Sequence, residues 1–225
     1  MNVGFRVLKR KRAVDAEVIA KFKKLPVANI SDSMHRMTAG GSRVRPLHAG
    51  GVLCGAAITV KTRPGDNLMV HMALNVASPG DVVVVDAGGD LTNSIVGERM
   101  LAHAEAKGFA GIVIDGAVRD YGYIKSRNFP VFAAGVSHRG PYKDGPGEIN
   151  VPIALDGMVI EPGDLIIGDD DGLLCVPFEQ AAEIYELALA KHVSETAEFP
   201  QIAQGTADRS SWIKRLRQLG CEIEE

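Results

Sequence analysis

Three apolar segments in the middle of the chain constrain its fold more than any other feature. Residues 81–86 (DVVVVD), 111–115 (GIVID) and 130–136 (PVFAAGV) are nearly continuous apolar runs of strand length, and helical segments at 97–108 and 121–128 separate them. Strands that are apolar on both faces are typical of a parallel sheet covered on each side. The sequence therefore predicts an α/β fold with a partly parallel central sheet and flanking helices.

Further elements are predicted on both sides of this core: helices at 14–25, 29–37 and 66–77, a strand at 51–62, hairpins from 149, a helix from Phe178 to about Glu195 and a last helix at 210–220. Pro200 is expected to break the long helix. The chain is expected to divide into an N-terminal helical extension (1–25), a single α/β domain (26–195) and a C-terminal helical tail (196–225).

The composition argues against several classes of protein. A formal net charge of −3 and a pI near 6.1 give no electrostatic reason to expect a nucleic-acid partner. The basic run 9–12 is read as a solvated end. The sequence contains no 18-residue apolar stretch and no apolar segment after the basic N-terminus, so neither a membrane span nor a leader is expected. Cys54, Cys175 and Cys221 form no paired motif and are expected to be free thiols of a cytoplasmic protein.

Polar residues follow two of the apolar strands, at the edge of a parallel sheet where active residues gather. Asp86 and Asp90 follow the first strand and lead to Gly97 and Glu98 at or near a helix start. The strand at 111–114 is expected to turn at Asp115–Gly116 and to lead to Arg119 and Asp120. If the two strands are neighbours, both sets face one crevice.

Arg119 and Asp120 have two interpretations. A guanidinium binds a carboxylate through two hydrogen bonds, and an aspartate is a suitable oxygen ligand for Mg²⁺ or Mn²⁺. The alternative is an exposed loop pair, or an aspartate that caps the following helix at Tyr121.

Residues 97–100 (GERM) also have two interpretations. A helix that begins near Gly97 exposes the backbone amides of Glu98, Arg99 and Met100, which could bind a carboxylate or phosphate. Alternatively, the helix begins earlier, with Asn93 or Ser94 as its cap.

Other motifs are absent or have simpler explanations. The acidic run 168–172 (GDDDG) is predicted to be a hairpin turn between two apolar strands. The histidines show no metal-binding spacing, and the sequence has no Gly-rich dinucleotide motif, no P-loop and no GxSxG elbow.

The segment GERMLAHAEAKGFAGIVIDGAVRDYGYI (97–124), with PVFAAGVS (130–137) and EPGDLIIGDDDGLLCVP (161–177), resembles the RraA-like family over roughly residues 25–195. That family includes class II pyruvate aldolases acting on 4-hydroxy-4-methyl-2-oxoglutarate and 4-carboxy-4-hydroxy-2-oxoadipate, oxaloacetate decarboxylases and a regulator of ribonuclease activity. The resemblance implies a ββα swivelling-domain-like three-layer sandwich and a homotrimer or homohexamer.

The resemblance also implies roles for individual residues. Arg119 would hold the carboxylate and enolate oxygen of pyruvate, Asp120 would anchor Mg²⁺ or Mn²⁺, and Glu98 would lie near the metal's waters. The backbone amides of Gly97, Glu98, Arg99 and Met100 would bind the substrate carboxylate, and Glu195 of a neighbouring subunit would complete the metal site. Retro-aldol cleavage and oxaloacetate decarboxylation both remain open, as do a non-catalytic regulator of an endoribonuclease and a lyase for a sugar acid.

Overall fold

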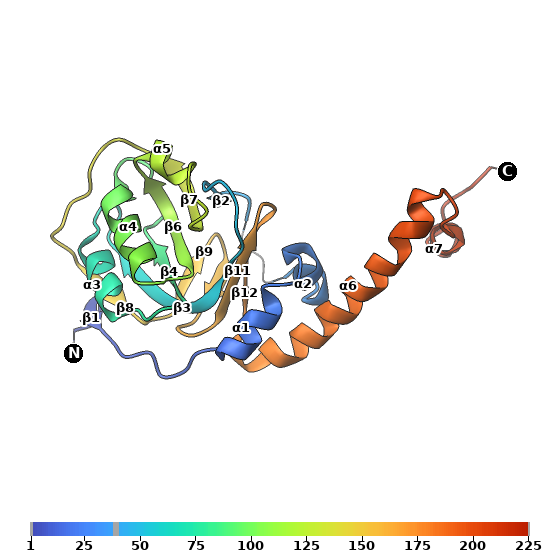
Figure 1. Cartoon of the computed structure of the whole chain (residues 1–225), viewed down its shortest axis with the longest axis horizontal. Coiled ribbons are helices and arrows are strands. Elements are labelled where there is room, and N and C mark those ends of the chain that lie inside the picture. Colours follow the sequence, from blue (N-terminus) through green and yellow to red (C-terminus); the bar gives the residue numbers. More distant parts are fainter. Residues whose placement is uncertain (1, 38–40, 225) are drawn as a thin grey trace.

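A computed structural model describes residues 2–37 and 41–224 (Figure 1). The helices are α1 (Ala16–Phe22), α2 (Val27–Ser33), α3 (Leu68–Val76), α4 (Glu98–Ala106), α5 (Tyr121–Ile124), α6 (Ala181–Ala203) and α7 (Ser210–Gln218), with a 3₁₀ turn at Phe178–Gln180. The strands are β1 (Phe5–Val7), β2 (Arg45–Pro46), β3 (Leu53–Thr62), β4 (Asp81–Asp86), β5 (Ser94–Val96), β6 (Gly111–Val118), β7 (Val131–Val136), β8 (Gly147–Ile149), β9 (Ile153–Leu155), β10 (Met158–Ile160), β11 (Leu165–Asp169) and β12 (Gly172–Val176).

Ten strands of the described residues form one mixed sheet, whose main order is β1-β8-β3-β4-β6-β7-β2. Its centre is parallel: β4 lies between β3 and β6, and β7 follows β6. The four valines of β4, residues 82–85, are fully buried, and burial of each valine side chain contributes about 2 kcal/mol. The predicted α/β fold with a partly parallel central sheet and flanking helices is confirmed.

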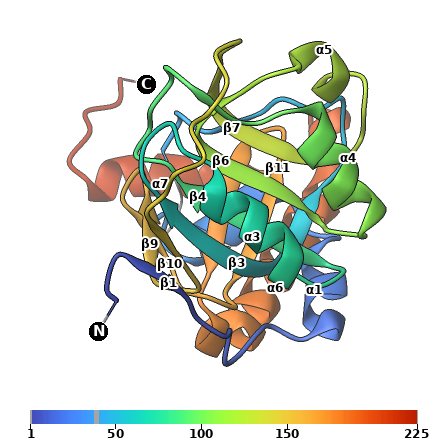
Figure 2. The same cartoon turned by 90° about the vertical axis from the view of Figure 1, so that its left-hand side faces the viewer.

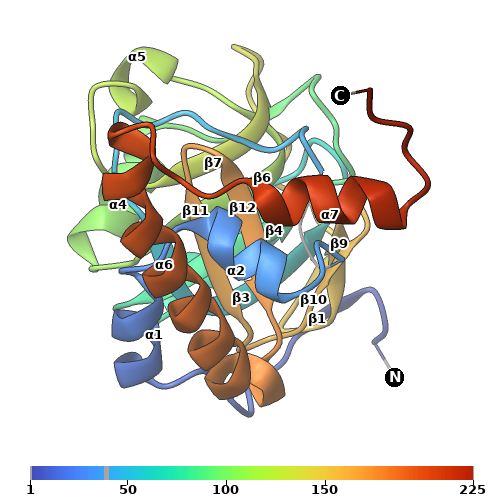
Figure 3. The same ribbon diagram turned by 90° about the vertical axis from the view of Figure 1, so that its right-hand side faces the viewer.

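Each face of the sheet is covered. Helices α3 and α4 lie over β3, β4 and β6 (Figure 2) and bury Ile58, Val83, Ile112 and Ile114 against Leu74 and Leu101. The opposite face packs against the β9–β10 hairpin. Helices α1, α2 and α6 cover the β11–β12 hairpin (Figure 3), and the far part of α6 extends away from the sheet (Figure 1).

Two predicted chain breaks are wrong. Asp115 and Gly116 do not form a turn but continue β6, because Arg43 binds the buried Asp115 carboxylate at 2.8 Å. Pro200 does not end α6, which continues to Ala203. Residues 193–203 are exposed, so water can reach the helix carbonyl that a proline leaves without a donor.

The N-terminal segment is held to the sheet rather than solvated. β1 pairs in parallel with β8, and two arginines of the basic run make ion pairs with distant carboxylates. Arg10 binds Asp81 at 2.7 Å and Arg12 binds Glu161 at 2.5 Å. The two arginines of the basic run therefore bind carboxylates of the same chain.

Cys54 and Cys175 are buried and unpaired, as predicted, and Cys221 is exposed. Burial raises the pKa of Cys54 to about 12, so this thiol stays protonated near neutral pH.

Within the described part of the chain, none of the helices has the length and apolar character needed to cross a membrane.

Candidate functional site

Helix α4 begins directly after Gly97, so the interpretation in which the helix starts there is correct and an earlier start at Asn93 or Ser94 is not. The first turn is closed by the Met100 amide, which donates to the Gly97 carbonyl at 3.0 Å. The Glu98 amide donates to Asp120 Oδ2 at 2.9 Å. The amides of Gly97 and Arg99 donate to no described residue. The helix start therefore offers two free backbone donors to an anion.

Arg119 and Asp120 follow directly from the end of β6. The Arg119 amide donates to the Val96 carbonyl at 2.9 Å, which places this pair beside the start of α4. Asp120 has a left-handed backbone, with φ of 57°, and lies at the N-cap position of α5. Its carboxylate nevertheless caps α4 through Glu98, so the predicted cap at Tyr121 is wrong.

Gly97 is required by the close approach of this pair. A Cβ atom at Gly97 would lie 2.5 Å from Asp120 Oδ2 and 2.8 Å from Arg119 Cγ. Its backbone is extended, so the restriction comes from space rather than from backbone strain. Only a glycine lets the end of β6 contact the first turn of α4 in this way.

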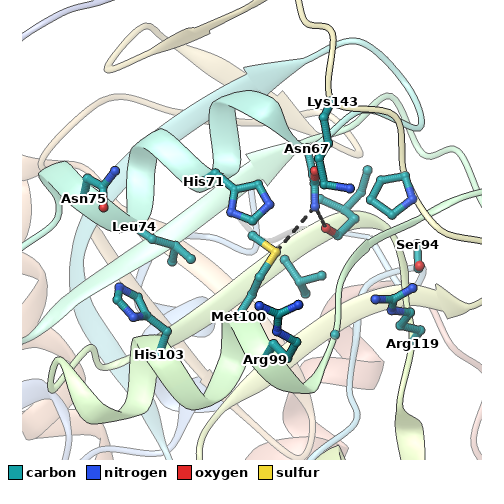
Figure 4. Close-up of a pocket in the computed structure, with 14 residues that line it drawn as sticks. Asn67, His71, Leu74, Asn75, Ser94, Arg99, Met100, His103, Arg119 and Lys143 are labelled. Carbon is teal, nitrogen blue, oxygen red and sulfur yellow. Dashed lines mark hydrogen bonds between the residues drawn. The ribbon is translucent and has the colours of Figure 1, made fainter.

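A cavity of about 530 Å³ opens beside this junction, between α3, α4 and the segment 141–143 (Figure 4). Its lining includes Gly97, Arg99, Met100 and Arg119 of the predicted site. Glu98 and Asp120 do not line the cavity and are exposed beside it. Six of the seven predicted site residues therefore lie at one junction.

Glu195 is the seventh predicted site residue, and the fold of a single chain does not bring it to Asp120. It lies on α6, which is on the other side of the sheet from α4 (Figure 1). Its carboxylate binds Asn29 Nδ2 at 2.5 Å and Lys191 Nζ at 2.7 Å. No three His, Cys, Asp or Glu side chains of the described residues are grouped to hold a metal ion.

The expectation that all the strand-end carboxylates share one crevice is wrong. Val113 packs on the sheet face opposite α3 and α4, and Asp115, two residues later, is on that same face. Burial raises the pKa of the Asp115 carboxyl. The guanidinium of Arg43 opposes this rise, whereas the nearby carboxylates of Asp86 and Asp156 add to it.

The run 168–172 is a hairpin turn between β11 and β12, as predicted.

The structure adds a wall of the cavity that the sequence pattern alone did not predict. Asn67, His71 and Asn75 lie four residues apart along α3 and its N-cap, and all three line the cavity, as does Lys143. This spacing puts them on one helix face, so the polar stripe within the predicted helix 66–77 was the available signal.

Asn67 joins this wall to the start of α4. It is 3% exposed, and its Nδ2 donates to the Ile95 carbonyl at 2.8 Å and to Met100 Sδ at 3.4 Å (Figure 4). Its Oδ1 has no hydrogen-bond partner among the described residues. A buried acceptor without a donor is costly, so a water or a bound ligand is expected to supply one.

Asp66 holds the segment that carries Lys143. This fully buried carboxylate accepts hydrogen bonds from the amides of Asp144, Gly145 and Leu68 at 2.7, 2.9 and 2.9 Å. Burial alone would raise the pKa of Asp66, but the three amides and Arg63 more than offset it, so the pKa is lowered.

The chain is similar to several known proteins. The family model described as RraA-like, Aldolase/RraA, matches residues 27–175. A relative from Halalkalibacterium halodurans, whose name provisionally assigns it as a 4-hydroxy-4-methyl-2-oxoglutarate aldolase, is 38% identical over 202 residues, or 90% of this chain and 96% of the relative. The 4-hydroxy-4-methyl-2-oxoglutarate aldolase of Thermus thermophilus is 35% identical over 112 residues, or 50% of this chain and 68% of that one. The structure of RraAS2 from Streptomyces coelicolor, described as an unusual member of the RNase ES inhibitor RraA protein family, matches with a TM-score of 0.75 and 27% identity over 84% of this chain and 98% of that one.

Proposed function

The chain belongs to the RraA-like family, and from this premise we propose that it is a lyase that cleaves a carbon–carbon bond of a 2-oxo acid and leaves a pyruvate enolate. One observation supports the proposal: Gly97, Arg99 and Arg119 line one cavity, and the amides of Gly97 and Arg99 donate to no described residue. Together they offer donors to both the carboxylate and the oxo group of such an acid.

Arg119 has the central part in this proposal. Breaking the bond next to the oxo carbon sends an electron pair to the oxo oxygen, where negative charge develops. A guanidinium placed beforehand stabilises that charge without having to reorganise during the reaction. The Asp120 carboxylate lies 3.7 Å from Arg119 Nε, so the proposed anion-binding and metal-binding groups are adjacent.

The residues present fit a divalent cation, Mg²⁺ or Mn²⁺. Asp120 and Glu98 are exposed carboxylates beside the cavity, and one or two carboxylates with several waters are an ordinary Mg²⁺ site. When bound, such a cation supplies positive charge that polarises the oxo group. The capping contact with Glu98 uses Asp120 Oδ2, which leaves Oδ1 for this purpose.

The two candidate reactions differ in their need for a base. Retro-aldol cleavage of a 4-hydroxy-2-oxo acid requires removal of the hydroxyl proton, and Glu98 is the exposed carboxylate beside Arg119 and Asp120 that could accept it. Decarboxylation of oxaloacetate gives the same enolate and requires no such base. The constellation is therefore proposed to support both reactions.

We further propose that the chain acts as a homotrimer or homohexamer in which Glu195 of one copy completes the site of another. Mixing subunits tests this assembly. Glu195→Ala and Asp120→Ala are each expected to be inactive, and exchange of their subunits is expected to restore part of the activity, because some sites then contain both carboxylates. Full activity of Glu195→Ala alone would contradict the shared site.

The function itself is tested by measuring pyruvate release from oxaloacetate and from 4-hydroxy-4-methyl-2-oxoglutarate, with Mg²⁺, with Mn²⁺ and with a chelator. Turnover that depends on the metal and is lost in Arg119→Ala is the expected result, and the relative rates decide between aldolase and decarboxylase. Turnover of neither compound by folded, metal-binding protein would contradict both reactions and favour another oxo acid.

A second candidate is a non-catalytic regulator of an endoribonuclease. It is favoured by the likeness to RraAS2, which is described within a family of RNase inhibitors. Inhibition of an endoribonuclease by both the wild type and Arg119→Ala, with no lyase activity in either, would support this candidate over the enzyme.

A further inference from the structure

We propose that Arg43 and Asp115 are positioning residues: their ion pair, on the sheet face away from the cavity, fixes the end of β6 and thereby the place of Arg119 beside α4. Neither residue of the pair would touch the substrate. This inference rests on the proposed function, because it concerns how the arginine of the proposed reaction is held.

The first support is an irregularity in β6 between the core of the sheet and the site. β6 pairs with β4 as far as Asp115, whose partner Asp86 is the last residue of β4. From Ala117 onward β6 pairs with β5 instead. Along β7 the register shifts between Ile114 and Ala117, where two residues of β6 face one of β7. A bulge of this kind bends a strand and re-aims the side chains beyond it, which here include Arg119.

The second support is that a glycine turn takes the place of β4 beyond this point. Gly88 and Gly89 both have left-handed backbones, and the Gly89 amide donates to the Asp115 carbonyl at 3.0 Å. The Ala117 amide donates to the Asp90 carbonyl at 3.1 Å. Because glycines can adopt many conformations, such a turn keeps one of them only when its neighbours restrain it. The direction of β6 therefore depends on how firmly this turn is held.

The third support is that Arg43 contacts both the strand and the turn. Its Nη2 atom lies 2.8 Å from Asp115 Oδ1 and donates to Oδ2 at 3.0 Å, while Oδ1 accepts no hydrogen bond from a described residue. The guanidinium also packs against Gly89, where a Cβ atom would collide with it. Asp115 is 3% exposed, so water can do little to solvate its charge. One side chain therefore holds the strand and the turn together.

The charges around Asp115 explain why this arginine is needed. Burial raises the pKa of the Asp115 carboxyl, Arg43 opposes the rise, and Asp86 and Asp156 add to it. Among the described residues that shift this pKa, Arg43 is the one cation. Without it, a buried carboxylate would face two like charges, and the end of β6 would be expected to move away from them.

Arg119 is carried directly by this end of β6. Its amide donates to the Val96 carbonyl at 2.9 Å, and its side chain lines the cavity (Figure 4). Arg43 and Asp115 are not among the described residues of that lining, so their effect on the reaction would pass through the backbone of β6. Misplacement of a reacting group by about 1 Å can lower a rate roughly a hundredfold.

The test is the kcat of pyruvate release by Arg43→Met, from whichever of the two proposed substrates the wild type turns over. The folded fraction is measured by circular dichroism, so that kcat refers to folded protein. We expect kcat to fall roughly tenfold to a hundredfold, and by a larger factor than KM rises, because Arg119 acts on charge that develops in the transition state. Arg43→Lys keeps a cation and is expected to recover part of kcat.

Arg10→Met is the matched control. Arg10 binds Asp81 at 2.7 Å, and Asp81 is 4% exposed at the start of β4, so this variant also leaves a buried carboxylate without its arginine. It is expected to lose stability while the kcat of the folded protein stays that of the wild type.

A double variant separates positioning from stability. Arg43→Met leaves the Asp115 charge buried and unpaired, whereas Arg43→Met combined with Asp115→Asn removes both charges. The double variant is expected to resist urea better than Arg43→Met and still to have a low kcat. A wild-type kcat in the folded double variant, or an equally large loss of kcat in Arg10→Met, would overturn the proposal.

Hydrogen exchange, followed by mass spectrometry of the segment 115–124, separates this failure from failure of the proposed function. The amides of Ala117 and Arg119 are expected to exchange faster in Arg43→Met than in the wild type and in Arg10→Met. If neither substrate is turned over but this difference is found, the positioning role stands and the proposed reaction fails. Equal exchange in all three proteins would overturn the positioning role.

Discussion

The carboxylate of Asp120 accepts a hydrogen bond from the backbone amide of Glu98 at 2.9 Å. This contact joins the end of β6 to the first turn of α4, across 22 residues of sequence. A side chain that follows one element thus caps another, and the same carboxylate is the proposed metal ligand. Its structural and chemical contributions can be separated by substitution.

Asp120→Asn keeps an oxygen that can accept the Glu98 amide but removes the charge, whereas Asp120→Ala removes both. Both variants are expected to lose metal-dependent pyruvate release by more than roughly a hundredfold, because the anionic ligand is gone. Only Asp120→Ala is expected to lose stability, by about 1 kcal/mol in urea unfolding, because it also removes the cap. Full activity of Asp120→Asn would contradict the metal role.

Gly97→Ala is expected to disrupt the junction, because its Cβ would lie 2.5 Å from Asp120 Oδ2. A forced shift of this kind costs about 1–3 kcal/mol in the free energy of unfolding and displaces Arg119, so activity is expected to fall as well. Gly122→Ala is the matched control, since a Cβ there meets no atom within 4 Å. Equal stability and activity of the two variants would show that the junction can relax.

Asp66→Asn is expected to destabilise the protein by about 2–3 kcal/mol at neutral pH, because a buried charged acceptor of three amides is replaced by a neutral one. The folded-state pKa of Asp66 is lowered, so its contribution is present above the ordinary value of 3.8 and is lost as the pH falls through the folded-state pKa. Urea unfolding of the wild type and of Asp66→Asn from pH 7 to pH 3 should therefore show that the difference between their free energies of unfolding shrinks as the pH falls. A difference independent of pH would mean that the charge is not what stabilises this loop.

His71 is expected to titrate below 6.5, because partial burial of its ring lowers its pKa and the nearby Lys143 and Arg99 lower it further. Arg99→Ala should raise the pKa of His71, and Lys143→Met should raise it too, since each removes a positive charge that opposes protonation. NMR titration of the imidazole measures both shifts, and the signal that disappears in His71→Gln assigns the resonance. A pKa above 6.5 in the free wild type would contradict this electrostatic description.

The central sheet could be predicted from the sequence because its strands are apolar on both faces, a pattern that depends only on neighbouring residues. The full length of β6 could not be predicted in this way. Asp115 extends the strand because Arg43, which is 72 residues away, binds its carboxylate, and only the tertiary fold brings them together. The ion pair of Arg10 could not be predicted either, because its partner Asp81 lies far along the chain, at the start of β4.

The predicted site residues other than Glu195 lie together at the junction of Gly97 with Arg119 and Asp120, where the local motif contains most of the geometry. The other wall was missed because Asn67 and Lys143 are far apart in sequence and are brought together by Asp66. Glu195 belongs to neither wall within one chain, and its proposed role requires a second copy.

One end of the cavity is lined by backbone and the other by exposed side chains, and this difference affects how such a protein can evolve. At the Gly97 end, the proposed contacts to a substrate come from backbone amides and depend on a glycine, at which a Cβ atom would lie 2.5 Å from Asp120 Oδ2. At the other end, the lining consists of side chains such as His71 and Arg99, which are exposed on helices and contribute little to the core. Mutations there are expected to change which ligand the cavity accepts while the fold persists, so one scaffold can diversify in its ligands without being rebuilt.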